Sequence, residues 1–132
     1  KMAAELVREE LGLQEKADFC STRKGILNPA DLTMEERGEL IRRQPAYGNI
    51  ICRCEMISEG EILDAIHRPL GATTMDGVKR RTRAGMGRCQ SGFCSPKTME
   101  ILERELKIRQ EKITKNGAGS EMILGRNQDG EI

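Results

Sequence analysis

The sequence predicts a small all-α protein whose cysteines lie in loops. Apolar residues recur at helical spacing in several separate segments. Two stretches, Thr33-x-x-Glu36 and Ser58-x-x-Glu61, have the capping-box pattern that begins a helix. Hydrophobic residues make up only 37% of the 132 residues, and the aromatic ones are Phe19, Tyr47 and Phe93. Because such a core is modest, a domain of this kind often needs a metal or a covalent cross-link for stability.

Three helices are expected in the first half of the chain. The first spans residues 3–11, and the other two follow the capping boxes, at about 34–43 and 59–68. The third carries one apolar face of Ile62, Leu63 and Ile66. Each helix is followed by a residue that stops helices: Gly12, Pro45 and Pro69.

The second half is expected to hold two more helices. Residues 75–84 form a short basic helix with Met75 and Val78 as its apolar anchors. Ser95-Pro96 is a typical N-cap and first-turn pair, and a longer helix follows it. Its apolar stripe is expected to consist of Met99, Leu102, Leu106 and Ile113. In the Gly-rich remainder, the run 122–124 is expected to be a strand or a docking segment.

Charge and hydropathy exclude several classes of function. Lysine and arginine number 22 against 21 acidic residues, so the formal net charge is +1. A near-neutral chain with few aromatics argues against nucleic-acid binding. No apolar run has the length of a membrane span, and no segment resembles a secretory signal, so a cytoplasmic location without direct membrane insertion is expected.

Four of the five cysteines form two tight pairs. Cys52 and Cys54 make C-x-C, Cys89 and Cys94 make C-x4-C, and Cys20 stands apart. An extended backbone would put the sulfurs of the first pair on the same side. The second pair lies in a loop rich in glycine, which lets backbone N–H groups approach sulfur closely.

Three kinds of site could use four such thiols. Disulfides are disfavoured by the strain of a C-x-C ring and by their rarity in cytosolic proteins. Structural zinc commonly takes four cysteines, although C-x-C is tighter than its usual ligand spacing. A [2Fe-2S] cluster also takes four thiolates, and its negative charge would be stabilised by nearby cations. The sequence supplies these as Lys79, Arg80, Arg81, Arg83 and Arg88, which could equally form a solvated helix face.

The two cysteine regions resemble a known family. The stretches "YGNIICRCEMISEGEILDAI" and "DGVKRRTRAGMGRCQSGFC" are similar to the bacterioferritin-associated-ferredoxin-like (BFD-like) [2Fe-2S] domain at the C-terminus of FAD-dependent oxidoreductases. The likeness is strongest to the A subunits of anaerobic glycerol-3-phosphate dehydrogenases and to their 2-hydroxy-acid-oxidising relatives. It covers residues 47–106 and includes both cysteine pairs and the length between them.

This resemblance implies a fold, a cofactor and a role. The fold would be a helix-turn-helix-like module with a [2Fe-2S] cluster in loops near the surface. Ser91 stands where the family usually has glycine, which removes no ligand. The role would be electron transfer between a flavin and an acceptor. The ligands would be Cys52, Cys54, Cys89 and Cys94.

The resemblance also implies a longer parent protein. The chain has no G-x-G-x-x-G motif, so the FAD-binding, substrate-oxidising part is missing and the fragment is not expected to be catalytic alone. Its expected partners are that FAD-binding part of the same polypeptide and an electron-acceptor subunit, through which it could associate with a membrane. The expected organisation is a helical connection (1–45), the [2Fe-2S] domain (46–113) and a Gly-rich tail (114–132). The alternative is a structural zinc or metal-free interaction domain that docks a partner through its basic helix.

The remaining candidates are interpreted as structural. Cys20 is expected to be an incidental, half-buried cysteine. His67 is expected to favour the C-terminal dipole of its helix. No nucleophile or base accompanies the carboxylates expected at a helix start, Glu55, Glu59 and Glu61.

Overall fold

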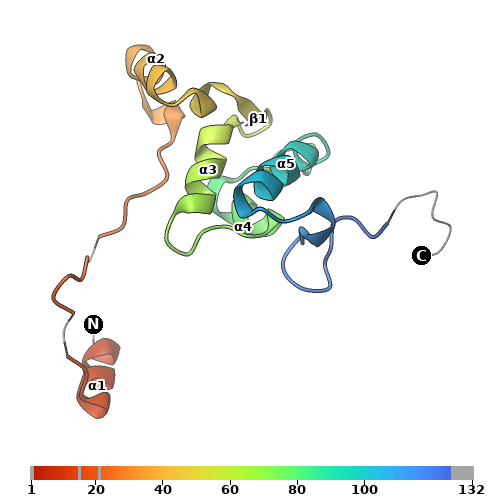
Figure 1. The fold of residues 1–132 in the computed structure, drawn as a ribbon. Coiled ribbons are helices and arrows are strands. Elements are labelled where there is room, and N and C mark those ends of the chain that lie inside the picture. Colours follow the sequence, from red (N-terminus) through yellow and green to blue (C-terminus); the bar gives the residue numbers. More distant parts are fainter. Residues whose placement is uncertain (1, 15, 21, 126–132) are drawn as a thin grey trace.

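The computed structural model describes residues 2–14, 16–20 and 22–125 (Figure 1). All five expected helices are present, as α1 (Met2–Leu11), α2 (Met34–Arg43), α3 (Glu59–His67), α4 (Met75–Thr82) and α5 (Ser95–Leu106). Three 3-10 turns accompany them: η1 (Pro29–Asp31), η2 (Pro45–Gly48) and η3 (Gln110–Lys112). Both predicted capping boxes are confirmed, because each hydroxyl accepts from the N3 backbone and each N3 carboxylate accepts from the cap.

The expectation of a purely α-helical fold is wrong, because a small sheet precedes α3. Strand β1 (Ile50–Cys52) pairs antiparallel with β2 (Ile57–Ser58), with Ile50 opposite Ser58 and Cys52 opposite Ile57. These strands are too short for alternation to be visible in the sequence. A turn over 53–56 joins them, and it places Met56 in the left-handed region at φ 56°. Cys52 therefore lies on a strand, whereas a loop was expected.

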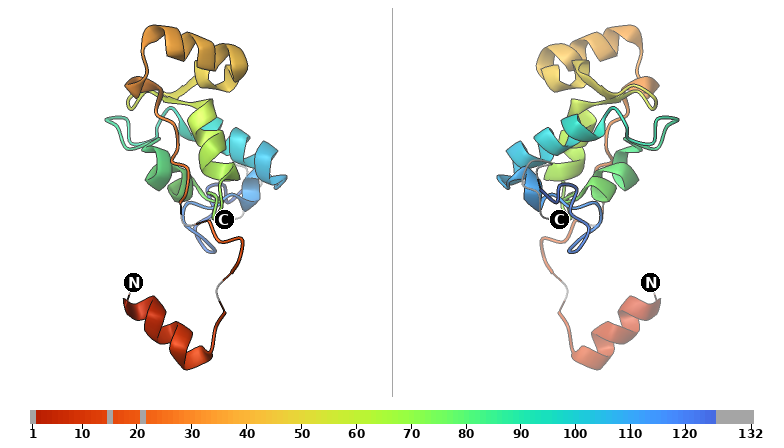
Figure 2. Two further views of the ribbon diagram at one scale, coloured as in Figure 1. Left: turned by 90° about the vertical axis from the view of Figure 1, so that its left-hand side faces the viewer. Right: turned by 90° about the vertical axis from the view of Figure 1, so that its right-hand side faces the viewer.

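The core lies among α3, α4 and α5, which pack together in the middle of the molecule (Figures 1 and 2). Ile62, Leu102 and Ile113 are fully buried there. Cys52 and Cys94 belong to the same buried cluster. The wall of the cysteine site is thus continuous with the hydrophobic core.

The segment after α5 departs from the prediction of one long helix. Helix α5 ends at Leu106 because Lys107 takes a left-handed conformation at φ 55°. The chain then returns, and Ile113 reaches the core from beyond η3 rather than from the helix stripe. The carbonyls of residues 114 and 115 accept from the N–H groups of Met75 and Asp76, which begin α4. Helices need such partners for their first N–H groups, so this segment caps α4.

The run 122–124, expected as a strand or docking segment, folds back onto the domain. The N–H of Met122 donates to the carbonyl of Ile113, and Ile123 packs partly buried against the core. Its neighbour Glu121 forms only an isolated bridge with Thr114. The run therefore does not form a strand.

A buried tyrosine joins α2 and η2 to the core helices. Tyr47 is 5% exposed, and its hydroxyl donates to Asp64 on α3 at 2.7 Å. A methyl group at Gly60 would lie 2.4 Å from the Tyr47 ring, so the ring lies directly on the first turn of α3. This contact fixes the chain just before β1.

Helix α1 stands apart from the other elements in both views of Figure 2. None of its residues is buried, including the apolar Leu6, Val7 and Leu11. It ends at Gly12 with φ 61°, as expected. Within the described residues, no helix has both the length and the apolar character needed to cross a membrane.

The two capping boxes have the same chemistry but differ in burial, which yields a prediction. Ser58 and Glu61 are 0% and 4% exposed, whereas Thr33 and Glu36 are exposed. Ser58→Ala would remove the cap and one hydrogen bond to a buried carboxylate, so we expect a loss of about 2–3 kcal/mol in the free energy of unfolding. Thr33→Ala should cost about 0.5–1 kcal/mol. Urea unfolding followed by circular dichroism measures both losses, and equal losses would contradict the role given to burial.

Candidate metal centre

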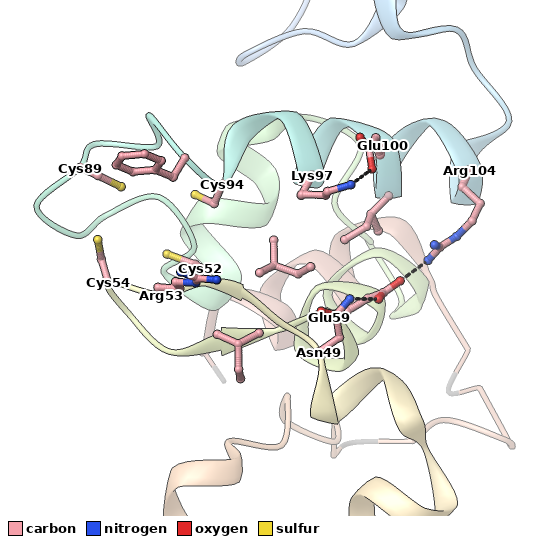
Figure 3. A pocket seen from close by; sticks show the side chains of 14 residues that line it. Asn49, Cys52, Arg53, Cys54, Glu59, Cys89, Cys94, Lys97, Glu100 and Arg104 are labelled. Atoms are coloured by element: carbon pink, nitrogen blue, oxygen red, sulfur yellow. Dashed lines mark hydrogen bonds and ion pairs between the residues drawn. The ribbon is translucent and has the colours of Figure 1, made fainter.

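The four paired cysteines line one cavity of about 800 Å³ (Figure 3). It lies between β1 with the turn that follows it and the start of α5, and Ile50, Ile51 and Ile101 are among its apolar lining residues. Cys52 and Cys54 approach from one wall, and Cys89 and Cys94 approach from the other. The structure therefore brings together the four residues that the sequence singled out.

Within the cavity the thiols form two neighbouring pairs. Cys52 lies beside Cys94 and helps to raise its pKa, and Cys54 lies beside Cys89 and helps to lower its pKa. Each contact joins one residue of C-x-C to one residue of C-x4-C, across more than thirty positions of sequence. Among the described residues, no three histidine, cysteine or acidic side chains are grouped so as to hold a metal ion.

The first contact lies in the interior. Cys52 is 1% exposed at the end of β1, and Cys94 is 3% exposed at the N-cap of α5. The N–H of Gly85 donates to the Cys52 sulfur at 3.5 Å. The backbone of Cys94 is held in turn, because its carbonyl accepts from the N–H and the hydroxyl of Thr98 at 2.9 and 3.0 Å. Contrary to expectation, Cys94 rather than Ser95 is the N-cap residue, and Ser95 is the first residue of the helix.

The second contact lies at the surface. Cys54 is exposed in the turn after β1, and Cys89 is half-buried in the loop before α5. A methyl group at Gly87 would lie 2.2 Å from the Cys54 Cβ, a separation that real Cβ atoms essentially never show. Only glycine at position 87 lets these two loops approach as they do.

Tight turns fold the loop from Arg83 to Cys94 around the sulfurs. The N–H of Met86 donates to the carbonyl of Arg83, and the N–H of Gln90 donates to that of Gly87, each at 2.9 Å. The left-handed region is occupied by Arg83, Gly85, Gln90 and Ser91. Three of these four are not glycine, so side chains and neighbours must hold a backbone that L-residues disfavour.

The two halves of the site differ in thiol acidity. Hydrogen bonds from the Phe93 N–H and from Cys54 lower the pKa of Cys89 below its ordinary value. Burial, with the neighbouring Cys52 and Cys89, raises the pKa of Cys94 to about 11. A metal must displace the proton from each thiol that it binds. The raised pKa of Cys94 therefore disfavours metal binding at that thiol, and increasingly so as the pH is lowered.

Several of the cations expected to face the site have other partners. Arg83 forms an ion pair with Glu55 at 2.8 Å, and Arg80 lies 3.6 Å from Asp76. Arg81 donates to the carbonyls of residues 70 and 77. Glu55 is therefore not a helix-start carboxylate as expected, whereas Glu59 and Glu61 do lie in the first turn of α3. The Arg83–Glu55 pair ties the loop of one cysteine pair to the turn of the other.

The end of the cavity away from the cysteines is lined by a polar network (Figure 3). Glu59 accepts from the Asn49 amide at 2.8 Å and from Arg104 at 2.6 Å. These bonds, chiefly the one from Arg104, lower the pKa of Glu59, so its carboxylate stays ionised. The network joins the residue before β1, the start of α3 and the end of α5.

The other candidate residues lie elsewhere. Cys20 is exposed rather than half-buried, and its thiol donates to the carbonyl of Thr22 at 3.0 Å. That threonine also lowers the pKa of Cys20. His67 is the last residue of α3, as expected, and its Nε2 lies 2.7 Å from a carboxylate oxygen of Glu105. Neither residue is among those lining the cavity.

Although no three of the described thiols are grouped around a single ion, the donor set fits a [2Fe-2S] cluster. Four thiols from two separate segments of the chain line one cavity, and such a cluster takes four thiolate ligands. A backbone N–H already donates to one of the sulfurs, which is the kind of contact that stabilises thiolate. Cys52, Cys54, Cys89 and Cys94 are the residues that would hold the cluster.

Comparison with known proteins supports this interpretation. The family model described as "BFD-like [2Fe-2S] binding domain" matches residues 50–104. This range contains all four cysteines and runs from β1 almost to the end of α5. No solved structure matches the chain.

The similar curated proteins are oxidoreductases. The chain is 50% identical over 113 residues to a glycerol 3-phosphate dehydrogenase of Caloramator mitchellensis. This alignment covers 86% of the present chain and 24% of that dehydrogenase. It is 33% identical over 104 residues to the A subunit of the anaerobic glycerol-3-phosphate dehydrogenase of Escherichia coli K12, covering 70% and 18%. It is 38% identical over 60 residues to the A subunit of the opine oxidase of Rhizobium meliloti, covering 45% and 11%. The chain thus spans a quarter or less of these relatives.

The contact at Gly87 yields a prediction for the metal site. Gly87→Ala should force the Cys54 turn away from the Cys89 loop, so we expect bound iron after anaerobic reconstitution to fall at least about tenfold. The helices should survive, because the clash is with Cys54 and not with the core. Gly25→Ala is the control, since a methyl group there meets nothing within 4 Å. Iron analysis with circular dichroism checks both variants, and full iron content in Gly87→Ala would contradict the geometry.

Proposed function

Since residues 50–104 belong to the BFD-like [2Fe-2S] binding domain family, we propose that this chain is the electron-transfer module of an FAD-dependent dehydrogenase. The observation that carries the proposal is the convergence of four cysteines on one cavity within the matched range. When bound, a [2Fe-2S] cluster supplies a one-electron redox couple.

The chain's own residues suit that role. Cys52 and Cys94 hold their sulfurs inside the protein, out of contact with water. Cys54 and Cys89 lie on the solvent side, where a partner can come close. The Arg83–Glu55 ion pair and the close approach at Gly87 keep the two ligand-bearing loops together.

We further propose that the parent protein oxidises glycerol 3-phosphate or a 2-hydroxy acid. The support is the 50% identity to a glycerol 3-phosphate dehydrogenase, of which this chain spans 24%. The FAD-binding part would be the electron donor, and the acceptor would be a separate subunit. On this account the protein works in the cytoplasm, in association with a membrane if its acceptor is membrane-bound.

A redox titration tests the module role. Protein prepared without oxygen and reconstituted with iron and sulfide should be brown and should lose its visible absorption on reduction with dithionite. We expect uptake of about one electron per chain. A colourless product would reject the proposal and favour the structural zinc or metal-free alternative, and a coloured product that dithionite does not change would reject the electron-transfer role.

Paired cysteine substitutions test the ligand set. Cys54→Ser should reduce cluster content at least about tenfold, because a ligand is lost from the solvent-side contact. Cys20→Ser removes a thiol that lies outside the cavity, so iron and sulfide content should match the unmodified chain. Loss of iron in the Cys20 variant, or its retention in the Cys54 variant, would show that the ligands are assigned wrongly.

A further inference from the structure

The backbone at Ser91 has a conformation that serine rarely takes. Ser91 has φ 71°, and the preceding Gln90 has φ 47°, so two successive non-glycine residues lie in the left-handed region. L-residues disfavour this region, and it persists only where surrounding contacts impose it. Ser91 lies midway between Cys89 and Cys94, inside the loop that carries both.

The Ser91 hydroxyl contacts the residue that serves Cys52. Ser91 Oγ donates to the carbonyl of Gly85 at 3.3 Å. A methyl group at Gly85 would stand 2.0 Å from Ser91 Oγ, so the two residues are in direct contact. Gly85 itself has φ 84°, and its N–H donates to the Cys52 sulfur at 3.5 Å.

The other side of Ser91 is attached to α5. The Ser91 carbonyl accepts from the backbone N–H of Ser95 at 3.1 Å and from its hydroxyl at 2.8 Å. Ser91 therefore connects the amide donor of Cys52 to the helix that begins at Cys94. These two cysteines are the buried members of the site, and both belong to the buried core cluster.

We propose that Ser91 is a positioning residue for the metal centre, whose hydroxyl holds Gly85 so that the Gly85 amide stays on the Cys52 sulfur. This inference deepens the proposed function and rests on it, because it takes Cys52 to be a cluster ligand. A hydrogen bond to a ligand sulfur stabilises the more negative, reduced state and so raises the reduction potential. Removing the Ser91 hydroxyl should therefore lower the potential without removing a ligand.

Three variants separate the hydroxyl from the backbone. Ser91→Ala removes the hydroxyl, and Ser91→Gly removes it while suiting the left-handed conformation. Ser95→Ala is the matched control, because it removes a hydroxyl bond from the first residue of α5 to the Ser91 carbonyl that does not reach Gly85. We expect a lower reduction potential in both Ser91 variants and a clearly smaller change in Ser95→Ala, in which the Ser91–Gly85 bond remains. If Ser91→Ala fails to fold, Ser91→Gly still decides the question.

Amide hydrogen exchange gives a second measurement that needs no cluster. In metal-free protein, the Gly85 amide should exchange about fivefold faster in both Ser91 variants, the ratio expected for loss of one ordinary hydrogen bond. The Leu102 amide, in the buried part of α5, serves as the internal reference and should not change. If the unmodified chain binds no cluster, the proposed function fails, while the exchange data still test the Ser91–Gly85 contact.

Three results would overturn the inference. In one, both Ser91 variants keep the potential and the Gly85 exchange rate of the unmodified chain. In another, Ser91→Gly has the reduction potential and Gly85 exchange rate of the unmodified chain while Ser91→Ala does not. That result would assign the effect to backbone conformation. In the third, Ser95→Ala changes both quantities as much as the Ser91 variants do.

Discussion

Gly87 lies so near Cys54 that a methyl group on it would stand 2.2 Å from the Cys54 Cβ. This approach brings together two loops that are separated by more than thirty residues of sequence, and without it the four thiols would not line one cavity. The Arg83–Glu55 ion pair and the hydrogen bond from the Gly85 amide to Cys52 also join these two segments. Each depends on a backbone that the loop can adopt only because glycines stand at 85 and 87 and left-handed residues are tolerated at 83, 90 and 91.

The core holds these loops at their bases. Strand β1 ends at Cys52, α4 ends just before Arg83, and α5 begins just after Cys94, so each loop starts or finishes on a packed element. Burying Cys52 and Cys94 makes the inner half of the site part of the core, whereas Cys54 and Cys89 remain accessible. If the four cysteines hold a cluster as proposed, stability and metal binding are coupled, since a change that loosens α5 also moves Cys94. The same arrangement leaves the solvent side open to a redox partner.

Much of this could be predicted from the sequence, because the relevant interactions are local. The capping boxes at Thr33 and Ser58 involve residues three apart, and the helices that they begin were expected within one or two residues of their observed bounds. The four candidate ligands were proposed from their spacing and the family resemblance, and the structure places all four at one cavity. What was missed depends on contacts distant in sequence: the β1–β2 pairing, the return of Ile113 to the core and the partnership of Arg83 with Glu55. The hydrophobic periodicity of a sequence predicts local elements and does not indicate such contacts. The half-burial expected for Cys20 was also wrong, since that residue is exposed.

The central claim is that four thiols from two loops hold iron and sulfide. The most direct measurement is the content of iron, acid-labile sulfide and zinc per chain, on protein purified without oxygen and reconstituted anaerobically. About two irons and two sulfides per chain, with little zinc, is the result that this account predicts. One zinc without sulfide, persisting after reconstitution with iron and sulfide, would contradict it and assign the four cysteines to a structural role.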